Sequence, residues 1–129
     1  MTRNMKSNLG IVAAILVVIG IFFYTGSSPT DVIDLQLNAI QKRDYQKAFS
    51  YMSKDFHEAT ALKDYEKFID NTVPLKNNKS IHIKEKTIKD KSGTISAVLI
   101  DKEGNKTPVE YKIIKEEDGW KIQVINLNP

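Results

Sequence analysis

The sequence predicts an α+β domain that follows a single N-terminal transmembrane helix. Residues 9–24 form an apolar run that carries no charge. Beyond it, apolar residues recur at helical spacing over residues 29–73. From residue 80 to the C-terminus they recur at every second position, which is typical of strands. Helices followed by strands indicate an α+β fold, here three helices packed on a four-stranded antiparallel sheet.

The apolar run defines a predicted transmembrane anchor over residues 9–26. In hydrocarbon a lone apolar segment has to satisfy its own backbone hydrogen bonds, so it inserts as a helix. With Asn8 included and at about 1.5 Å per residue, this helix reaches about 28 Å, which spans a slightly thinned bilayer. Residues 1–8 form a short basic tail, and no acidic residue occurs before Asp31. Positive charge stays in the cytoplasm, so we expect residues 29–129 to lie outside.

A cleaved signal peptide is the alternative interpretation of the same segment. Thr25, Gly26 and Ser27 loosely resemble a cleavage site, because small residues are favoured there. The bulky Phe-Phe-Tyr at residues 22–24 and the length of the apolar run favour retention. The chain has no cysteine, which excludes attachment through a lipid-modified cysteine, disulfides and thiolate metal sites.

The balance of charge argues against nucleic acid as a partner. The 129 residues include 19 basic and 16 acidic side chains, for a formal net charge of +3. Arg3 and Lys6 belong to the tail, so the predicted outer domain is close to neutral. Arginine, which recognises phosphates and bases through paired hydrogen bonds, occurs only at Arg3 and Arg43. We therefore expect no nucleic-acid binding.

The first two helices of the domain are expected to begin at typical capping residues. Ser28 is the predicted N-cap of a helix over residues 29–42, with Pro29 at its first position. Asp44 is the predicted N-cap of a short helix over residues 45–52, whose apolar side chains recur at i, i+3, i+4 and i+7.

A third helix is expected over residues 62–73, after a polar loop at residues 53–61. Tyr65 and Ile69 share one face of this helix. Pro74 is expected to end it, because the residue before a proline avoids the helical conformation.

Four strands are expected over residues 80–88, 94–101, 107–115 and 120–127. Short polar connections with turn residues separate them, so we expect an antiparallel meander with the first strand at an edge. The side chains that alternation assigns to one face are, strand by strand, Ile81, Ile83, Glu85 and Thr87; Ile95, Ala97 and Leu99; Val109, Tyr111 and Ile113; and Trp120, Ile122 and Val124.

This order of elements resembles the nuclear-transport-factor-2-like superfamily and, more narrowly, small bacterial membrane-attached domains of unknown function within it. The residues that carry the resemblance, over about residues 29–127, are Val32, Leu37, Ala39, Ile40, Asp44, Ala48, Phe49, Phe68, Tyr111, Gly119, Trp120, Lys121 and Ile122. The resemblance implies a cystatin-like sheet that curls into a cone around a pocket. Members include enzymes, ligand carriers, dimerisation modules and secretion-system parts, so the fold does not determine the function.

No catalytic or metal-binding set is expected. His57 and His82 are the only histidines, and neither has a partner at metal-ligand spacing. The resemblance implies that proton-transferring members place a carboxylate or a His–Asp pair inside the cone. Here the inward face of the last two strands offers no acid. Asp44 could lie at a pocket rim, but a helix cap is the simpler interpretation. We expect a protein that is not an enzyme and that has no cofactor.

Two candidate binding surfaces remain. The first is an apolar ligand pocket lined by Tyr45, Phe49, Tyr111, Trp120 and Ile122. Its alternative is that these residues form the core, with Trp120 packed on Ile33, Leu37 or Phe49. The second is a membrane-surface contact made by Lys84, Lys86, Lys89 and Lys91 with anionic lipid headgroups. Its alternative is that these lysines protect an exposed edge strand from pairing.

The sequence therefore predicts a single-pass protein of a bacterial cytoplasmic (inner) membrane, with its N-terminus inside. The outer domain is expected to act as a non-catalytic protein–protein or assembly component of the cell envelope. A carrier of a small apolar ligand and a secreted form after signal cleavage are the alternatives. A homodimer through the open sheet face is a further expectation, because Val98, Ile100 and Ile114 point away from the predicted core.

Overall fold

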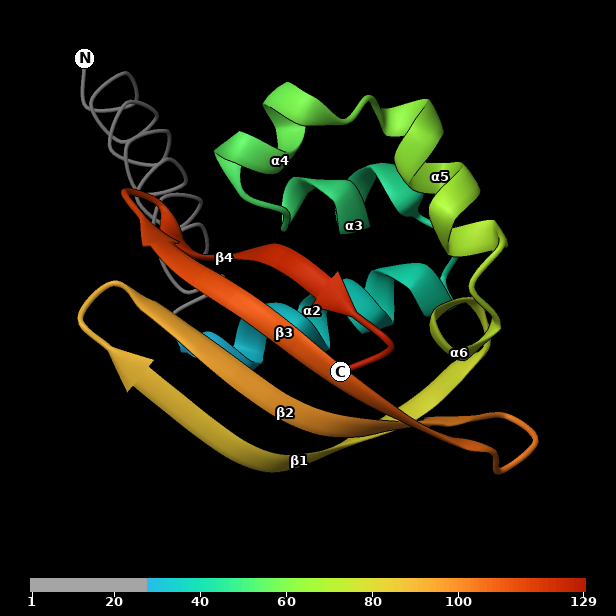
Figure 1. Cartoon of the computed structure of the whole chain (residues 1–129). Coiled ribbons are helices and arrows are strands. Elements are labelled where there is room, and N and C mark those ends of the chain that lie inside the picture. The colour runs from blue at the N-terminus through green and yellow to red at the C-terminus, as the bar shows by residue number, and fades with distance from the viewer. Residues whose placement is uncertain (1–27) are drawn as a thin grey trace, which may run out of the picture.

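The computed structural model describes residues 28–129 and confirms an α+β fold (Figure 1). The predicted tail and anchor, residues 1–26, lie outside this range. Within it, no helix is long and apolar enough to cross a membrane. The helices are α2 (Pro29–Gln41), α3 (Tyr45–Ser50), α4 (Lys54–Ala59), α5 (Leu62–Asp70) and α6 (Val73–Lys76), and the strands are β1 (Asn78–Lys89), β2 (Ser92–Asp101), β3 (Lys106–Glu116) and β4 (Gly119–Asn126).

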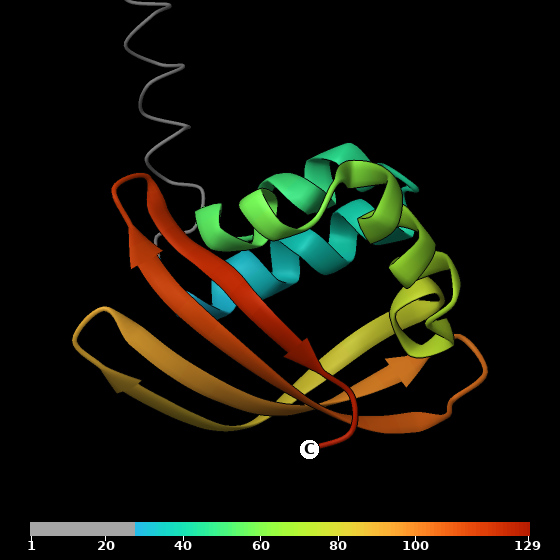
Figure 2. The same cartoon turned by 45° about the horizontal axis from the view of Figure 1, so that its top comes forward.

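Helix α2 begins where the capping pattern predicts and lies inside the curve of the sheet. The Ser28 side chain accepts a hydrogen bond from the backbone N–H of Asp31 at 3.2 Å, and Pro29 occupies the first turn. Ile33 and Leu37 lie on its buried face. Because α2 contacts both edge strands, β1 and β4, the sheet curls around this helix (Figure 2).

The remaining helices are more numerous than predicted. Asp44 caps α3 as expected, because its side chain accepts the backbone N–H of Lys47 at 3.2 Å. The predicted polar loop at residues 53–61 is wrong, since most of it forms α4. The predicted third helix is also too long: it ends at Asp70, and Pro74 lies in the first turn of α6 rather than ending a helix. A proline is tolerated there because a first-turn N–H needs no helical partner.

The sheet is the predicted antiparallel meander, with the order β1-β2-β3-β4. Ile95 on β2 pairs with Tyr111 on β3, and both side chains are fully buried against the helices. The predicted core faces of these two central strands are confirmed. Alternation is reliable here because the β2–β3 register runs without a shift.

Strand β1 departs from simple alternation. A register shift between Ile83 and Glu85 inserts one extra residue, so Lys86 and Ile88 replace Glu85 and Thr87 on the helix-facing side. The predicted single face of this strand is therefore wrong beyond Ile83. The prediction that β1 lies at an edge is confirmed, and its second half is exposed.

Candidate functional site

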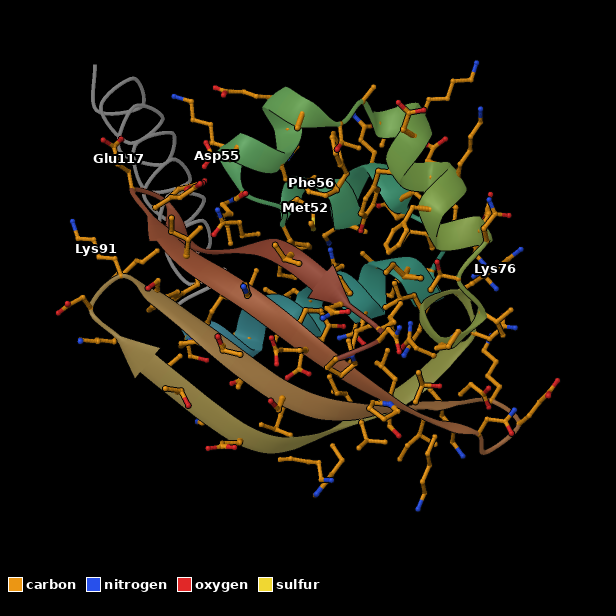
Figure 3. All side chains as sticks on the ribbon, in the orientation of Figure 1. Met52, Asp55, Phe56, Lys76, Lys91 and Glu117 are labelled. Carbon is orange, nitrogen blue, oxygen red and sulfur yellow. The ribbon has the colours of Figure 1, made fainter. Side chains whose placement is uncertain are left out.

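An apolar groove lies between the edge strand β4 and the helices α4 and α5. Its volume is about 450 Å³, and its residues are Met52, Phe56, Thr60, Phe68, Gln123, Val124 and Ile125. We call it the β4 groove. Figure 3 shows Met52 and Phe56 between α4 and β4. The Phe68 side chain is 38% exposed and that of Val124 is 41% exposed, so apolar surface is presented to solvent here.

The start of α4 is fixed to β4, and this places one wall of the groove. The Ser53 side chain caps α4 by accepting the backbone N–H of Phe56 at 3.2 Å. The backbone N–H of Ser53 donates to the carbonyl of Ile122 at 2.7 Å. The backbone N–H of Lys54 donates to the Glu116 carboxylate at 3.0 Å. These bonds hold the first turn of α4 against the end of the sheet, so Phe56 is directed over the groove.

Helix α5 supplies the other part of this wall. Tyr65 and Ile69 are fully buried on its inner face. Phe68 precedes Ile69 by one residue, which rotates it about 100° around the helix axis, away from the core and toward the groove. The helix thus buries two apolar side chains in the core and offers a third to the groove.

The strand wall depends on a bulge that sequence alternation does not predict. Ile122 pairs with Ile113, but the next pair is Val124 with Lys112, so Gln123 is an extra residue. The prediction that Val124 faces the core is therefore wrong, since Val124 shares the outer face with Lys112. Ile125 takes the inward position instead and packs against the core. The bulge brings Gln123, Val124 and Ile125 together along the groove.

A cluster of aromatic rings supports the groove from behind. The Phe49 ring lies 4.0 Å from that of His57, 5.2 Å from that of Tyr65 and 6.2 Å from that of Phe56, measured between centroids. The Phe56 and Tyr65 rings meet edge to face at 6.0 Å. These contacts bury apolar area and fix ring orientations, so the α4 wall is braced by α3 and α5.

Buried polar groups lie beneath the floor of the groove. The amide nitrogen of Gln36 donates to the Met52 sulfur and to the Tyr65 hydroxyl, each at 3.0 Å. Within residues 28–129, the Gln36 carbonyl oxygen and the Tyr111 hydroxyl have no hydrogen-bond partner. Burial raises the pKa of Tyr65 and of Tyr111, so both phenols stay protonated. Gln36 therefore holds Met52, the floor of the groove, from below.

The residues predicted to line a ligand pocket do not line the β4 groove. Tyr111, Trp120 and Ile122 are buried in the core. Phe49 belongs to the aromatic cluster, and the Tyr45 hydroxyl donates to the Asp70 carboxylate at 2.9 Å on the exposed side of α3. Burial and the neighbouring Asp70 carboxylate raise the pKa of Tyr45, so this phenol also remains neutral.

The four predicted membrane-contact lysines lie along β1 and its turn. Lys84 and Lys86 are exposed on the strand. Lys89 and Lys91 line a shallow charged depression together with Asp90 and with residues of the β3 end. The surface there carries both signs of charge, and the lysines occupy the free edge of β1.

The histidines do not gather metal ligands in the part of the chain that the structure describes. His57 lies on α4 against Phe49, and His82 is exposed on β1. Across residues 28–129, no group of three His, Cys, Asp or Glu side chains could hold a metal ion.

Sequence reasoning missed the residues of the β4 groove. The available signal was the start of α4, where Ser53 is followed by an acid in the first turn at Asp55. That pattern predicts a helix in place of the loop and would have placed Phe56 on it. The bulge at Gln123 has no comparable signal in the sequence.

The comparisons with known proteins agree on the fold. A solved SEC-C motif containing protein from Rhodopseudomonas palustris matches with a TM-score of 0.62 and 9% identity, over 81% of this chain and 82% of that one. A Campylobacter jejuni protein described as an NTF2-like transpeptidase matches with a TM-score of 0.52 and 19% identity, over 76% and 99%. The expected nuclear-transport-factor-2-like fold is thereby supported. At these identities the likeness concerns the fold alone.

The family comparison covers the whole described domain. No curated protein matches the chain. A family model described as a domain of unknown function, DUF4864, matches residues 26–129, and the chain belongs to that family.

Proposed function

We propose that this member of the DUF4864 family is a membrane-tethered binding module of a bacterial cell envelope, which docks a partner protein in the β4 groove. The observation that carries the proposal is an apolar groove of about 450 Å³ beside an edge strand. A contiguous apolar patch that is exposed to solvent often marks a protein–protein or ligand-binding site.

The side chains of the groove favour non-covalent binding. Phe56 and Phe68 provide aromatic area, while Thr60 and Gln123 provide neutral hydrogen-bonding groups. None of the residues that line the groove ionises near neutral pH, whereas proton transfer needs a positioned acid or base. Aromatic anchors surrounded by neutral polar groups are typical of the centre of a protein–protein interface.

The N-terminal sequence supports the location. Residues 9–26 are long enough to anchor the chain, and residues 1–8 carry the positive charge that favours a cytoplasmic N-terminus. A tether confines the domain to the membrane surface and raises its effective concentration toward membrane partners. A modest groove can then support a specific complex without high intrinsic affinity.

Site-specific photocrosslinking in the cells that make the protein tests this function. A benzophenone amino acid at Val124 reports on the groove, and the same group at Ile88, which is 40% exposed on β1, is the matched control. We expect a protein adduct from position 124 that Phe68→Asp removes and that position 88 does not give. Identical adducts from both positions, or none from position 124, would contradict docking in the groove.

A carrier of a small apolar ligand is the second candidate function. The groove volume falls within the range of about 300–1,000 Å³ that is typical of ligand sites. Native mass spectrometry of the full chain, extracted from its own membranes, separates the candidates. A small adduct that Phe68→Asp abolishes would favour the carrier, and a co-purifying protein would favour docking. A chain that starts near Ser28 would instead identify the secreted form and remove the tether.

A further inference from the structure

The chain itself already uses part of the outer edge of β4 for strand pairing. The backbone N–H of Ile122 donates to the carbonyl of Tyr51 at 2.9 Å, and the backbone N–H of Ser53 donates to the carbonyl of Ile122 at 2.7 Å. These bonds form a parallel bridge between Met52 and Ile122. The chain then turns away into α4 at Lys54, so this short cover ends where the β4 groove begins.

The next outward-facing backbone groups on β4 belong to Ile125. Antiparallel pairs alternate between those that exchange hydrogen bonds and those whose N–H and C=O point away from each other. Ile113 pairs with Ile122, and Tyr111 pairs with Ile125. Because Ile113 and Tyr111 lie two positions apart on β3, both pairs are of the kind that does not exchange hydrogen bonds. Since Ile122 directs both groups outward to the Met52 segment, Ile125 directs both groups outward into the groove. Among the described residues, none outside the sheet bonds to them.

The two edges of the sheet differ in how they are protected. The β1 edge carries Lys84, Lys86 and Lys89, and edge lysines discourage pairing with another strand. The groove-lining part of β4, residues 123–125, reads Gln-Val-Ile and carries no charge. An uncharged edge beside aromatic side chains lacks this protection and favours an uncharged partner segment.

We infer that the β4 groove receives an extended, uncharged peptide segment of a partner protein, which adds to β4 as a further strand at Ile125. This inference rests on the proposed function and specifies the conformation and chemistry of the partner. The segment continues the edge pairing that Met52 begins. Alternate apolar side chains of the segment contact Phe56 and Phe68 on one side and Val124 on the other. A helix cannot pair in this way, because its backbone groups are already bonded within the helix.

The test uses the full chain in lipid nanodiscs and random octapeptides displayed on phage. The enriched peptides are synthesised, and their affinity is measured by fluorescence anisotropy for the wild type, Phe68→Asp and the matched control Phe68→Leu. We expect uncharged peptides with apolar residues at alternate positions. We also expect Phe68→Asp to weaken binding at least about tenfold and Phe68→Leu to change it less than about threefold.

Amide hydrogen exchange measured by NMR then distinguishes strand addition from simple apolar contact. In the free chain the Ile125 amide is expected to exchange quickly, whereas that of Asn126, which is paired with Glu110, is protected. A saturating selected peptide should slow exchange at Ile125 by at least about tenfold and leave Asn126 unchanged.

Three results would overturn strand addition. A peptide whose binding depends on Phe68 but leaves exchange at Ile125 unchanged would remove strand addition and leave the proposed function intact. Protection of Ile125 in the free chain would show that a second copy or the chain's own N-terminal segment covers this edge. Failure of every peptide to depend on Phe68 would reject a peptide partner. In that case the crosslinks from Val124 decide separately whether the groove docks a folded protein.

Discussion

At the scale of single residues, two buried tyrosine hydroxyls differ in their hydrogen bonding. The Tyr65 hydroxyl accepts a hydrogen bond from Gln36 at 3.0 Å. The Tyr111 hydroxyl is also buried, but no protein group in residues 28–129 bonds to it. Removing one partner of a buried hydrogen bond is destabilising, whereas removing an unpaired hydroxyl is close to neutral. The two tyrosines are thus a matched pair for mutation.

We expect Tyr65→Phe to lower the free energy of unfolding by about 1–2 kcal/mol, because the Gln36 amide loses an acceptor. Tyr111→Phe should change it by less than about 0.5 kcal/mol or raise it. Urea denaturation followed by circular dichroism gives both values. Equal losses in the two variants would show that the Tyr111 hydroxyl has a stabilising partner.

Trp120 is the large aromatic side chain of β4, and it is 7% exposed. The prediction that it belongs to the core is confirmed. We expect Trp120→Ala to lower the free energy of unfolding by about 3–5 kcal/mol, through lost apolar burial and the cavity that remains. Val124→Ala on the same strand is the control and should change it by no more than about 0.5 kcal/mol. A loss below about 1 kcal/mol for Trp120→Ala in urea denaturation would contradict its core position.

At the scale of elements, the β2–β3 turn depends on one carboxylate. The Asp101 side chain accepts the backbone N–H groups of Glu103 and Asn105, each at 2.9 Å, and the Asn105 side-chain amide at 3.1 Å. Burial alone raises the pKa of Asp101, but the hydrogen bonds from Asn105 and its neighbours outweigh burial and leave this pKa below its ordinary value. The charged form therefore stabilises the turn.

The sign of the pH dependence follows from this lowered pKa. The stabilisation is complete above the unfolded pKa of about 3.9 and is lost as the pH falls through the lower folded pKa. We expect the wild type to unfold at a higher urea concentration than Asp101→Asn near pH 6. This difference in the unfolding midpoint should shrink as the pH falls below about 4. A gap that stays constant down to about pH 2 would show that the charge of Asp101 does not stabilise the fold.

At the scale of the whole molecule, the helices and the sheet of the described residues share one apolar core. Helix α2 lies in the curve of the sheet and contacts both of its edges. The buried apolar side chains of the described residues extend from Val32 on this helix to Ile122 on β4. We therefore predict that residues 28–129 fold without the apolar segment at residues 9–26, whose role as an anchor stays a prediction from the sequence.

We expect deletion of residues 1–27 to release the protein from the membrane without loss of fold. The melting temperature should stay within about 3 °C of the full chain, which corresponds to less than about 0.8 kcal/mol for a domain of this size. Membrane fractionation and circular dichroism measure the two effects. A truncated chain that remains in the membrane fraction would show that the domain itself binds lipid, and the lysines of β1 would then be the first residues to mutate.

Most of the fold follows from local patterns that can be read along the chain. Ser28 and Asp44 predict two helix starts because capping depends on neighbouring residues. Alternation predicts the core faces of β2 and β3 because their shared register is regular. The tether, the cytoplasmic N-terminus and the partner remain predictions from the sequence.

The β4 groove is decided only by the tertiary structure. Its residues come from α4, α5, β4 and the segment that precedes α4. The hydrogen bonds of Ile122 with Tyr51 and Ser53, which are distant from it in sequence, bring these elements together. The bulge at Gln123 pairs Val124 with Lys112, which places Val124 on the outer face of β4. Local sequence thus determined which segments are helices and strands, whereas long-range pairing decided where apolar side chains remain exposed beside an open backbone edge.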